Sequence, residues 1–315
     1  MGMHSNPSDD ELDSLFSNSD PEVVWHKACA IIRRFDPAYD FRLARRILDD
    51  VLRLFHGVYP GYSEIGTPYH DLPHTLDVFL CAVRLMHGVH LSGTRFSNEE
   101  MTLILIASLT HDIGYAQLQD EAVGTGARYT LTHVQRGIEF MRRYLAGMPL
   151  PADFPDRLGC LISCTDTALS LSDIQFPDER TRLLGQIVVT ADMLGQMAGR
   201  TYLERLLFLY QEFQEANVGG YKNIQDLLNK TKQFYEITRA KLDGPFGGVY
   251  AHLAWHFKDS LGNERNYYIE SIEKNMAYLE KVVALDEADY LSMLRRGGVV
   301  SAAGNLPTVG GPLKE

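Results

Sequence analysis

Hydrophobic residues recur every three to four positions along most of this chain, and no segment alternates between apolar and polar residues as a half-buried strand does. The clearest stripe follows Pro73, which suits the first turn of a helix because its missing N–H would be unpaired there anyway. The stripe consists of Leu76, Phe79, Leu80, Val83 and Met86. Such a stripe covers one face of a helix. The pattern predicts an all-α fold.

Two short motifs mark expected helix starts. Ser97 precedes Glu100 by three residues, which is the spacing of a capping box, where two side chains reciprocally satisfy backbone N–H groups. Thr132 and Gln135 repeat this spacing before a helix that should extend to about Leu145. Both motifs precede apolar positions with helical spacing, so they predict where two of the helices begin.

Clusters of glycine and proline mark the expected breaks between helices. Gly114 should end the helix over residues 101–110, residues 149–155 should form a linker, and residues 244–248 should end a long helical region. The remaining helical segments are expected over residues 23–34, 41–55, 156–168, 179–198, 200–243, 249–260 and 266–284.

The two ends of the chain differ in composition from the rest. Residues 1–20 are polar and acidic and residues 297–315 are glycine-rich, so both are expected to be disordered. Residues 21–200 should form one domain, and residues 201–290 a helical C-terminal extension. The extension has a dense aromatic face, interpreted either as core or as the face of a homodimer, made of Tyr202, Phe208, Tyr210, Phe213, Phe234 and Tyr235.

The strongest candidate for chemistry is the pair His111–Asp112, which closes an apolar helix. Burying an imidazole and a carboxylate is unfavourable without a partner, and a metal cation that binds both is one such partner. His74 and Asp192, a lone acid in another apolar helix, add two further donors. Each residue alone has an ordinary explanation, such as a hydrogen bond or an arginine partner. As an ordered set they predict a buried divalent-metal site for Mg, Mn, Fe or Zn.

The order His … His-Asp … Asp resembles the signature of the HD superfamily of metal-dependent phosphohydrolases, over roughly residues 50–200. Within that family the chain is most similar to the catalytic domain of class I cyclic-nucleotide phosphodiesterases. Their Tyr-His-Asn-x-x-His, Ala-Thr-Asp-Met and Cys-Ala-Asp-Leu motifs are similar to residues 69–74, 164–167 and 190–193. The resemblance implies an HD-domain helical bundle over residues 21–200.

The resemblance also implies one or two metal ions per chain, the first held by His74, His111, Asp112 and Asp192. Asp112 would bridge to the second ion. His133 stands four residues before Gly137, the spacing at which many two-metal HD proteins carry a further ligand. The alternative for His133 is a surface histidine at a helix N-terminus.

His70 matches the histidine that donates a proton to the leaving oxygen in the phosphodiesterases, a role that suits imidazole because its pKa lies near working pH. The alternative is a loop histidine hydrogen-bonded to Asp71. Thr165 and Asp166 match a segment that contributes to the substrate pocket, although Asp166 has the alternative of a helix cap or a surface acid. The predicted catalytic residues are therefore His70 and Asp112.

The chain departs from the phosphodiesterases in ways that leave the substrate open. Residues 113–116 read Ile-Gly-Tyr-Ala, where those enzymes continue with His-Pro-Gly. Their Gln–Phe purine clamp has no counterpart, since Gln233 and Phe234 are adjacent and fit a helix better. Residues 111–114 are also similar to the start of the cyclic-dinucleotide HD-GYP group, but the later Gly-Tyr-Pro motif is absent.

Composition narrows the possible partners. The formal net charge of −11 argues against nucleic acid, whose backbone requires a basic face. No stretch approaches the ~20 apolar residues of a membrane span, and residues 1–22 lack an apolar signal-peptide core. These features favour a cytoplasmic protein that acts on a small phosphate ester without a membrane partner.

The sequence as a whole predicts metal-dependent hydrolysis of a phosphate ester, a nucleotide or a cyclic nucleotide. Two other interpretations stay open. Some HD-fold proteins hold two irons and use dioxygen to oxidise a C–H bond, and His133 would suit that role too. A sensor could instead hold metal or nucleotide at the same residues without turnover.

Overall fold

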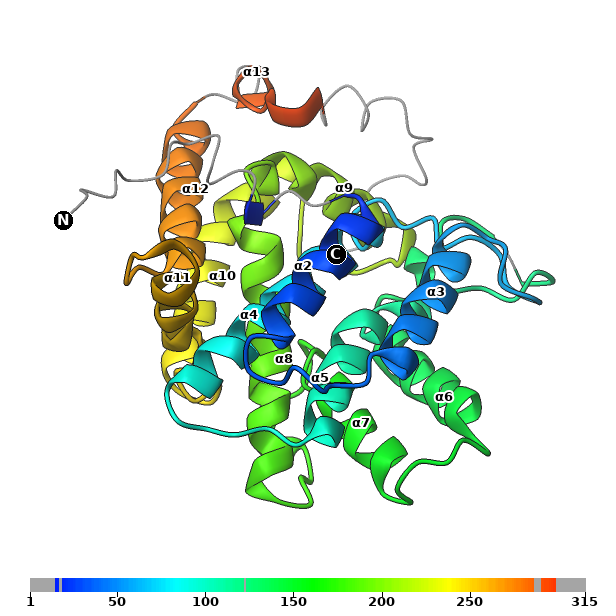
Figure 1. The fold of residues 1–315 in the computed structure, drawn as a ribbon. Helices are drawn as coiled ribbons and strands as arrows, with labels where there is room; N and C mark the ends of the chain where they lie inside the picture. The colour runs from blue at the N-terminus through cyan, green and yellow to red at the C-terminus, as the bar shows by residue number, and fades with distance from the viewer. Residues whose placement is uncertain (1–14, 17–18, 122, 286–289, 299–315) are drawn as a thin grey trace.

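The computed structural model describes residues 15–16, 19–121, 123–285 and 290–298 (Figure 1). The disorder expected at the two chain ends falls mostly on residues outside this part. All regular structure in the described part is helical, and the only β-pairing there is an isolated bridge between Tyr62 and Leu118. The all-α class is confirmed.

The α-helices are α2 (Pro21–Ile32), α3 (Arg42–Phe55), α4 (Leu72–Leu91), α5 (Asn98–Thr110), α6 (His133–Leu145), α7 (Phe154–Ser163), α8 (Glu179–Ala198), α9 (Tyr202–Glu215), α10 (Ile224–Asp243), α11 (Leu253–Leu261), α12 (Tyr267–Val283) and α13 (Tyr290–Met293). Short 3-10 turns connect them: η1 (Ile113–Tyr115), η2 (Ala127–Tyr129), η3 (Leu171–Asp173), η4 (Val249–His252) and η5 (Arg296–Gly298).

The capping chemistry explains some helix starts and corrects one. The Ser97–Glu100 capping box is confirmed at the start of α5. The Thr132–Gln135 capping box is wrong, because Thr132 makes no side-chain bond to the N-terminus of α6. Its backbone has φ −132 and ψ −4 rather than extended angles, and its hydroxyl donates instead to the Tyr129 carbonyl (3.4 Å).

Three expected segments have different bounds in the structure. The α7 helix ends at Ser163 rather than near residue 168, because the chain continues in tight turns with Thr165 N–H bonding to the Ile162 carbonyl. The region 200–243 is broken between α9 and α10, where Asn217 has φ 53. The segment 249–260 begins as the η4 turn before α11.

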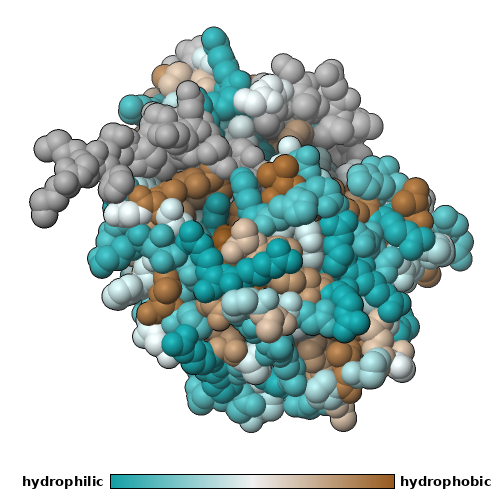
Figure 2. Space-filling model, viewed as in Figure 1, coloured by the Kyte–Doolittle hydropathy of each residue, from teal (hydrophilic) through white to brown (hydrophobic). Residues whose placement is uncertain are grey.

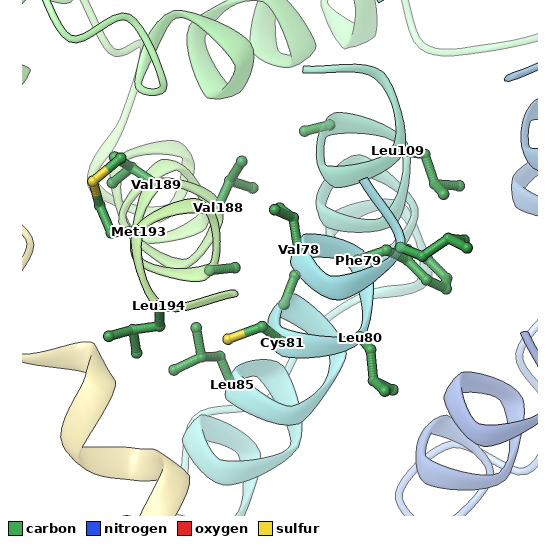
Figure 3. Packing of buried hydrophobic residues seen from close by; sticks show 14 of the residues in the cluster. Val78, Phe79, Leu80, Cys81, Leu85, Leu109, Val188, Val189, Met193 and Leu194 are labelled. Atoms are coloured by element: carbon green, nitrogen blue, oxygen red, sulfur yellow. The ribbon is translucent and has the colours of Figure 1, made fainter. Parts of the chain in front are cut away.

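The core is centred on the contact between α4 and α8, which lie in the middle of the molecule in Figure 1. Figure 3 shows Val78, Cys81 and Leu85 on the side of α4 that faces Leu194 of α8, and all four are at most 1% exposed. A side chain at Gly195 would lie 3.1 Å from the Val78 backbone nitrogen. This close approach places the N-terminal half of α4 beside the C-terminal end of α8.

The other helices surround this pair. The α3, α6 and α7 helices lie on one side of it in Figure 1, and α10, α11 and α12 on the other. In the view of Figure 2, hydrophilic residues cover most of the described surface, with hydrophobic ones in small groups between them. None of the described helices is both long and apolar enough to cross a membrane.

Candidate metal centre and substrate pocket

The predicted metal donors come from three different helices. His74 lies in the first turn of α4, where the carboxylate of Asp71 caps the helix by accepting from the His74 N–H (2.9 Å). His111 and Asp112 directly follow α5. Asp192 lies within α8, the helix that packs against α4. The packing of α4, α5 and α8 therefore brings together residues that are far apart in the sequence.

The four side chains meet in one buried cluster. His74 Nε2 lies 3.2 Å from His111 Nε2, and Asp112 Oδ2 lies 3.2 and 3.1 Å from these two nitrogens. These three donor atoms lie within 4.8 Å of one another and their residues are buried. Asp192 Oδ1 lies 3.5 Å from His74 Nε2 and 3.8 Å from His111 Nε2. The structure thus brings together all four donors that the sequence predicted.

The residues of this cluster fit a divalent metal ion. Neighbouring donor atoms bound to one ion at about 2.0–2.2 Å lie about 3–3.5 Å apart, which matches the separations among the first three donors. Asp112 Oδ2 is buried, yet no described residue completes a hydrogen bond to it. The His111 Nδ1 atom is bonded to the Ser108 carbonyl (3.1 Å), which leaves Nε2 as the lone-pair donor. Imidazole nitrogens and carboxylate oxygens suit Mg, Mn, Fe and Zn alike.

The charges of the cluster support one another electrostatically. Burial alone would lower the pKa of His111, but the carboxylates of Asp112 and Asp192 raise it to about 9. Burial would raise the pKa of Asp112, but His111 and His70 hold it well below its usual range. The pKa of Asp192 is raised, chiefly by burial. Two carboxylates in one buried place therefore require positive charge nearby, from imidazolium or from a cation.

His133 lies on the other side of the Asp112 carboxylate. His133 Nε2 lies 3.4 Å from Asp112 Oδ1, whereas Oδ2 is the atom that faces His74 and His111. His133 Nδ1 is bonded to the Thr130 carbonyl (2.7 Å), so Nε2 is again the nitrogen that can bind a metal ion. This arrangement allows Asp112 to contact two cations, one through each oxygen.

Gly114 brings α6, and with it His133, close to Asp112. A Cβ atom at Gly114 would lie 1.8 Å from the His133 carbonyl oxygen, so only glycine fits there. Arg136 fixes the contact by donating to the carbonyls of Gly114 (2.9 Å) and Ala116 (2.8 Å). The expectation that Gly114 ends the preceding helix is wrong, because α5 already ends at Thr110 and Gly114 lies inside η1.

His70 is held by a residue that sequence reasoning missed. Its Nδ1 lies 2.5 Å from Glu212 Oε2, and Glu212 Oε1 accepts from the backbone N–H groups of Tyr69 (2.6 Å) and His70 (3.2 Å). Burial alone would lower the pKa of His70, but the charges of Glu212 and Asp112 raise it to about 9. The alternative partner Asp71 is wrong, since Asp71 caps α4 and binds Arg205.

The α9 helix connects the loops that carry the site histidines. Arg205 donates to both carboxylate oxygens of Asp71 (3.0 and 2.8 Å), next to His70. Glu215 accepts from the backbone N–H groups of Thr125 and Gly126, in the loop that precedes His133. The sequence pattern predicts α9 only as part of an aromatic face. The spacing of its charged residues places Arg205 and Glu212 on one face, but their partners cannot be identified locally.

A cavity of about 410 Å³ adjoins the cluster and is lined by His70, Asp112, His133 and Asp192. Thr165 and Asp166 also line it, as predicted, from the turn after α7. Much of the remaining wall consists of apolar side chains of α9, α10 and the segment between them: Leu206, Leu209, Phe213, Tyr221, Leu227 and Phe234.

Apart from its histidines, the cavity contains little positive charge. Among the described residues that line it, Lys230 is the only lysine or arginine. Its ammonium group is already bonded to the Asp226 carboxylate (2.9 Å) and the Gly220 carbonyl (2.6 Å). Asp112, Asp166 and Asp192 line the same space. An anionic ligand would therefore require a bound cation to offset these carboxylates.

A scan against models of known protein families finds no match, and a search of curated proteins finds no similar sequence. The interpretation of this centre therefore depends on its geometry and on the residues themselves.

Proposed function

We propose that this protein is a metal-dependent phosphohydrolase of the HD type that cleaves a phosphate ester of a nucleotide or cyclic nucleotide. The observation that carries the proposal is the convergence of His74, His111 and Asp112 beside a ligand-sized cavity, with a buried Asp112 oxygen that no described residue satisfies. Asp192 would complete the first metal site, and His133 with Asp112 would hold a second ion.

A divalent ion at this place would supply Lewis acidity and neutralise charge on a phosphoryl group. The carboxylates lining the cavity favour such an ion over an arginine cluster as the means of binding phosphate. Asp112, which faces His74 and His111 through one oxygen and His133 through the other, would fix the position of both cations.

His70 is suited to protonating the leaving oxygen. His70 Nδ1 is hydrogen-bonded to the Glu212 carboxylate, so Nε2 carries the proton that the ring can transfer to a substrate. The raised pKa of about 9 keeps the ring protonated at neutral pH, as a proton donor must be. His70 lines the cavity and packs edge-on against His74, but it is not one of the three converging donors, so we assign it a role separate from metal binding.

The cavity suits an ester with one phosphate and a largely uncharged body. Its apolar and aromatic wall from α9 and α10 would accommodate a flat base, and its single, already paired lysine leaves no site for further phosphates. Thr165 and Asp166 would contribute polar contacts to the same ligand.

The proposal is tested by elemental analysis of the purified protein, followed by chelation, reloading and assay. The protein should contain at least one divalent ion per chain, and it should hydrolyse a member of a phosphate-ester panel after reloading with Mn, Mg, Fe or Zn. The chelated protein without added metal is the control. A metal-free preparation that no ion restores, or a reloaded protein that cleaves no ester, contradicts the proposal.

The apolar wall yields a separate prediction about substrate size. Phe234 and Ile237 both lie on α10 and are 40% and 49% exposed, but only Phe234 lines the cavity. Phe234→Ala should raise KM for naphthyl phosphate by about 3–10-fold, since it removes apolar contact with the ester. It should leave KM for methyl phosphate unchanged. Ile237→Ala is the matched control and should alter neither; equal effects of the two substitutions would contradict this placement of the substrate.

A further inference from the structure

Tyr115 packs against two of the candidate site histidines. It follows Asp112 by three residues, in the η1 turn, and is fully buried. Its ring stacks on His133 with centroids 4.4 Å apart and planes 10° apart, and on His70 at 5.0 Å and 23°. The centroids of the two histidine rings are 6.2 Å apart, so Tyr115 and both histidines form one packed group of rings.

The hydroxyl group of Tyr115 has no partner of its own. The side chain lines the cavity, yet no hydrogen bond to its buried oxygen is made within the described part of the chain. The Thr130 hydroxyl is near enough to affect the pKa of Tyr115, but it donates its own proton to the Ala127 carbonyl (2.6 Å). A phenol ordinarily has a pKa of about 10, so at neutral pH the hydroxyl group has a proton to donate.

A buried hydroxyl without an acceptor is unfavourable, and a ligand with an acceptor oxygen would relieve that cost. A non-bridging phosphate oxygen is a strong acceptor of such a hydrogen bond.

We propose that Tyr115 is a substrate-binding residue whose hydroxyl group donates a hydrogen bond to the phosphoryl group of the bound ester. This inference rests on the proposed function, because it takes the cavity ligand to be a phosphate ester.

The structure offers a matched control for this role. Tyr267 is also fully buried, its hydroxyl group also has no partner among the described residues, and it does not line the cavity. Tyr115→Phe and Tyr267→Phe therefore remove the same atom from equally buried positions. One of these positions lines the cavity and the other does not.

The two variants are compared in the metal-loaded full-length protein, on the best ester of the panel. Tyr115→Phe should lower kcat/KM by about 10–100-fold, the effect of losing one hydrogen bond to a charged group. It should keep its metal content and its Tm. Tyr267→Phe should match the wild type in all three measurements. A kcat/KM of Tyr115→Phe within twofold of the wild type, or a loss that accompanies loss of metal, overturns the inference.

A failure of the proposed function can be distinguished from a failure of the inference about Tyr115. If the wild type cleaves no ester, binding of inorganic phosphate to the metal-loaded protein is measured by calorimetry instead. The inference then expects Tyr115→Phe to bind phosphate about 10–100-fold more weakly than the wild type and Tyr267→Phe to bind it equally well. Equal affinities in all three proteins, or no phosphate binding by the wild type, overturn it.

Discussion

Replacing Asp112 by asparagine should remove metal binding and hydrolysis together. Asp112 Oδ2 lies within 3.2 Å of the Nε2 atoms of His74 and His111, and Oδ1 lies 3.4 Å from His133 Nε2, so the one carboxylate serves every candidate metal position. The amide that replaces it is neutral. Loss of a group that merely supports a ligand costs about 10–100-fold in metal affinity, and loss of a ligand charge should exceed that.

The measurement is metal content and hydrolysis, with thermal unfolding as a second readout. Metal at 100 times its Kd adds about 2.7 kcal/mol of stability to a folded protein that binds it, which should raise Tm by several degrees. In Asp112→Asn the metal-dependent rise should vanish. If added metal does not raise the Tm of the wild type, the cluster binds no metal.

A second buried acid provides the control. Glu204 of α9 is 0% exposed. Among the described residues, it belongs neither to the metal cluster nor to the lining of the cavity. Glu204→Gln makes the same acid-to-amide change in another buried place, so it tests whether any such change disturbs the fold. It should keep the metal, the metal-dependent rise in Tm and the activity. Equal losses in both variants would show that Asp112 acts through general stability.

The candidate metal donors could be predicted because of their surroundings. Asp192 stands out in the sequence as one acid among Val189, Ala191 and Leu194, all of which the structure shows to be buried. A polar residue in such a helix needs a partner, and few partners suit both a carboxylate and two histidines. The helical spacing of apolar residues also predicts α4, α5 and α8. The packing of these helices brings the candidate metal donors together.

The residues that position the donors could not be predicted in the same way. Glu212 lies in a helix with several other charged residues, and its partner His70 is 142 positions away in the chain. No local pattern connects two such positions, because the contact forms only when α9 packs against the loop that precedes α4. The sequence predicts Gly114 only as the end of a helix. The close approach of α6, which is the reason that glycine is needed there, is likewise a tertiary contact.

Substituting His70 by alanine should slow hydrolysis by about 10²–10⁴-fold while sparing metal binding, since that is the usual contribution of a general acid. The loss should be large for an ester with a poor leaving group and much smaller for a nitrophenyl ester, whose leaving oxygen needs little protonation. Equal losses on the two esters would show that His70 does not donate the proton. Loss of metal would instead make it a ligand.

Glu212→Gln should give a related effect through the pKa of His70. Burial lowers that pKa, and the Glu212 charge is the largest of the influences that raise it to about 9. Without that charge the pKa falls, so the protonated ring that serves as the acid is lost at lower pH. The alkaline limb of the rate profile should therefore move to lower pH by one unit or more, while metal content stays unchanged.

The comparison between variants remains valid when metal is bound. A bound cation would lower the pKa of His70 in the wild type and in Glu212→Gln alike, so the difference between their alkaline limbs still reports the Glu212 charge. Glu204→Gln, a buried acid-to-amide change on the same helix, should leave the profile where the wild type has it. An unshifted limb in Glu212→Gln, with activity retained, would mean that the rate does not depend on a protonated His70.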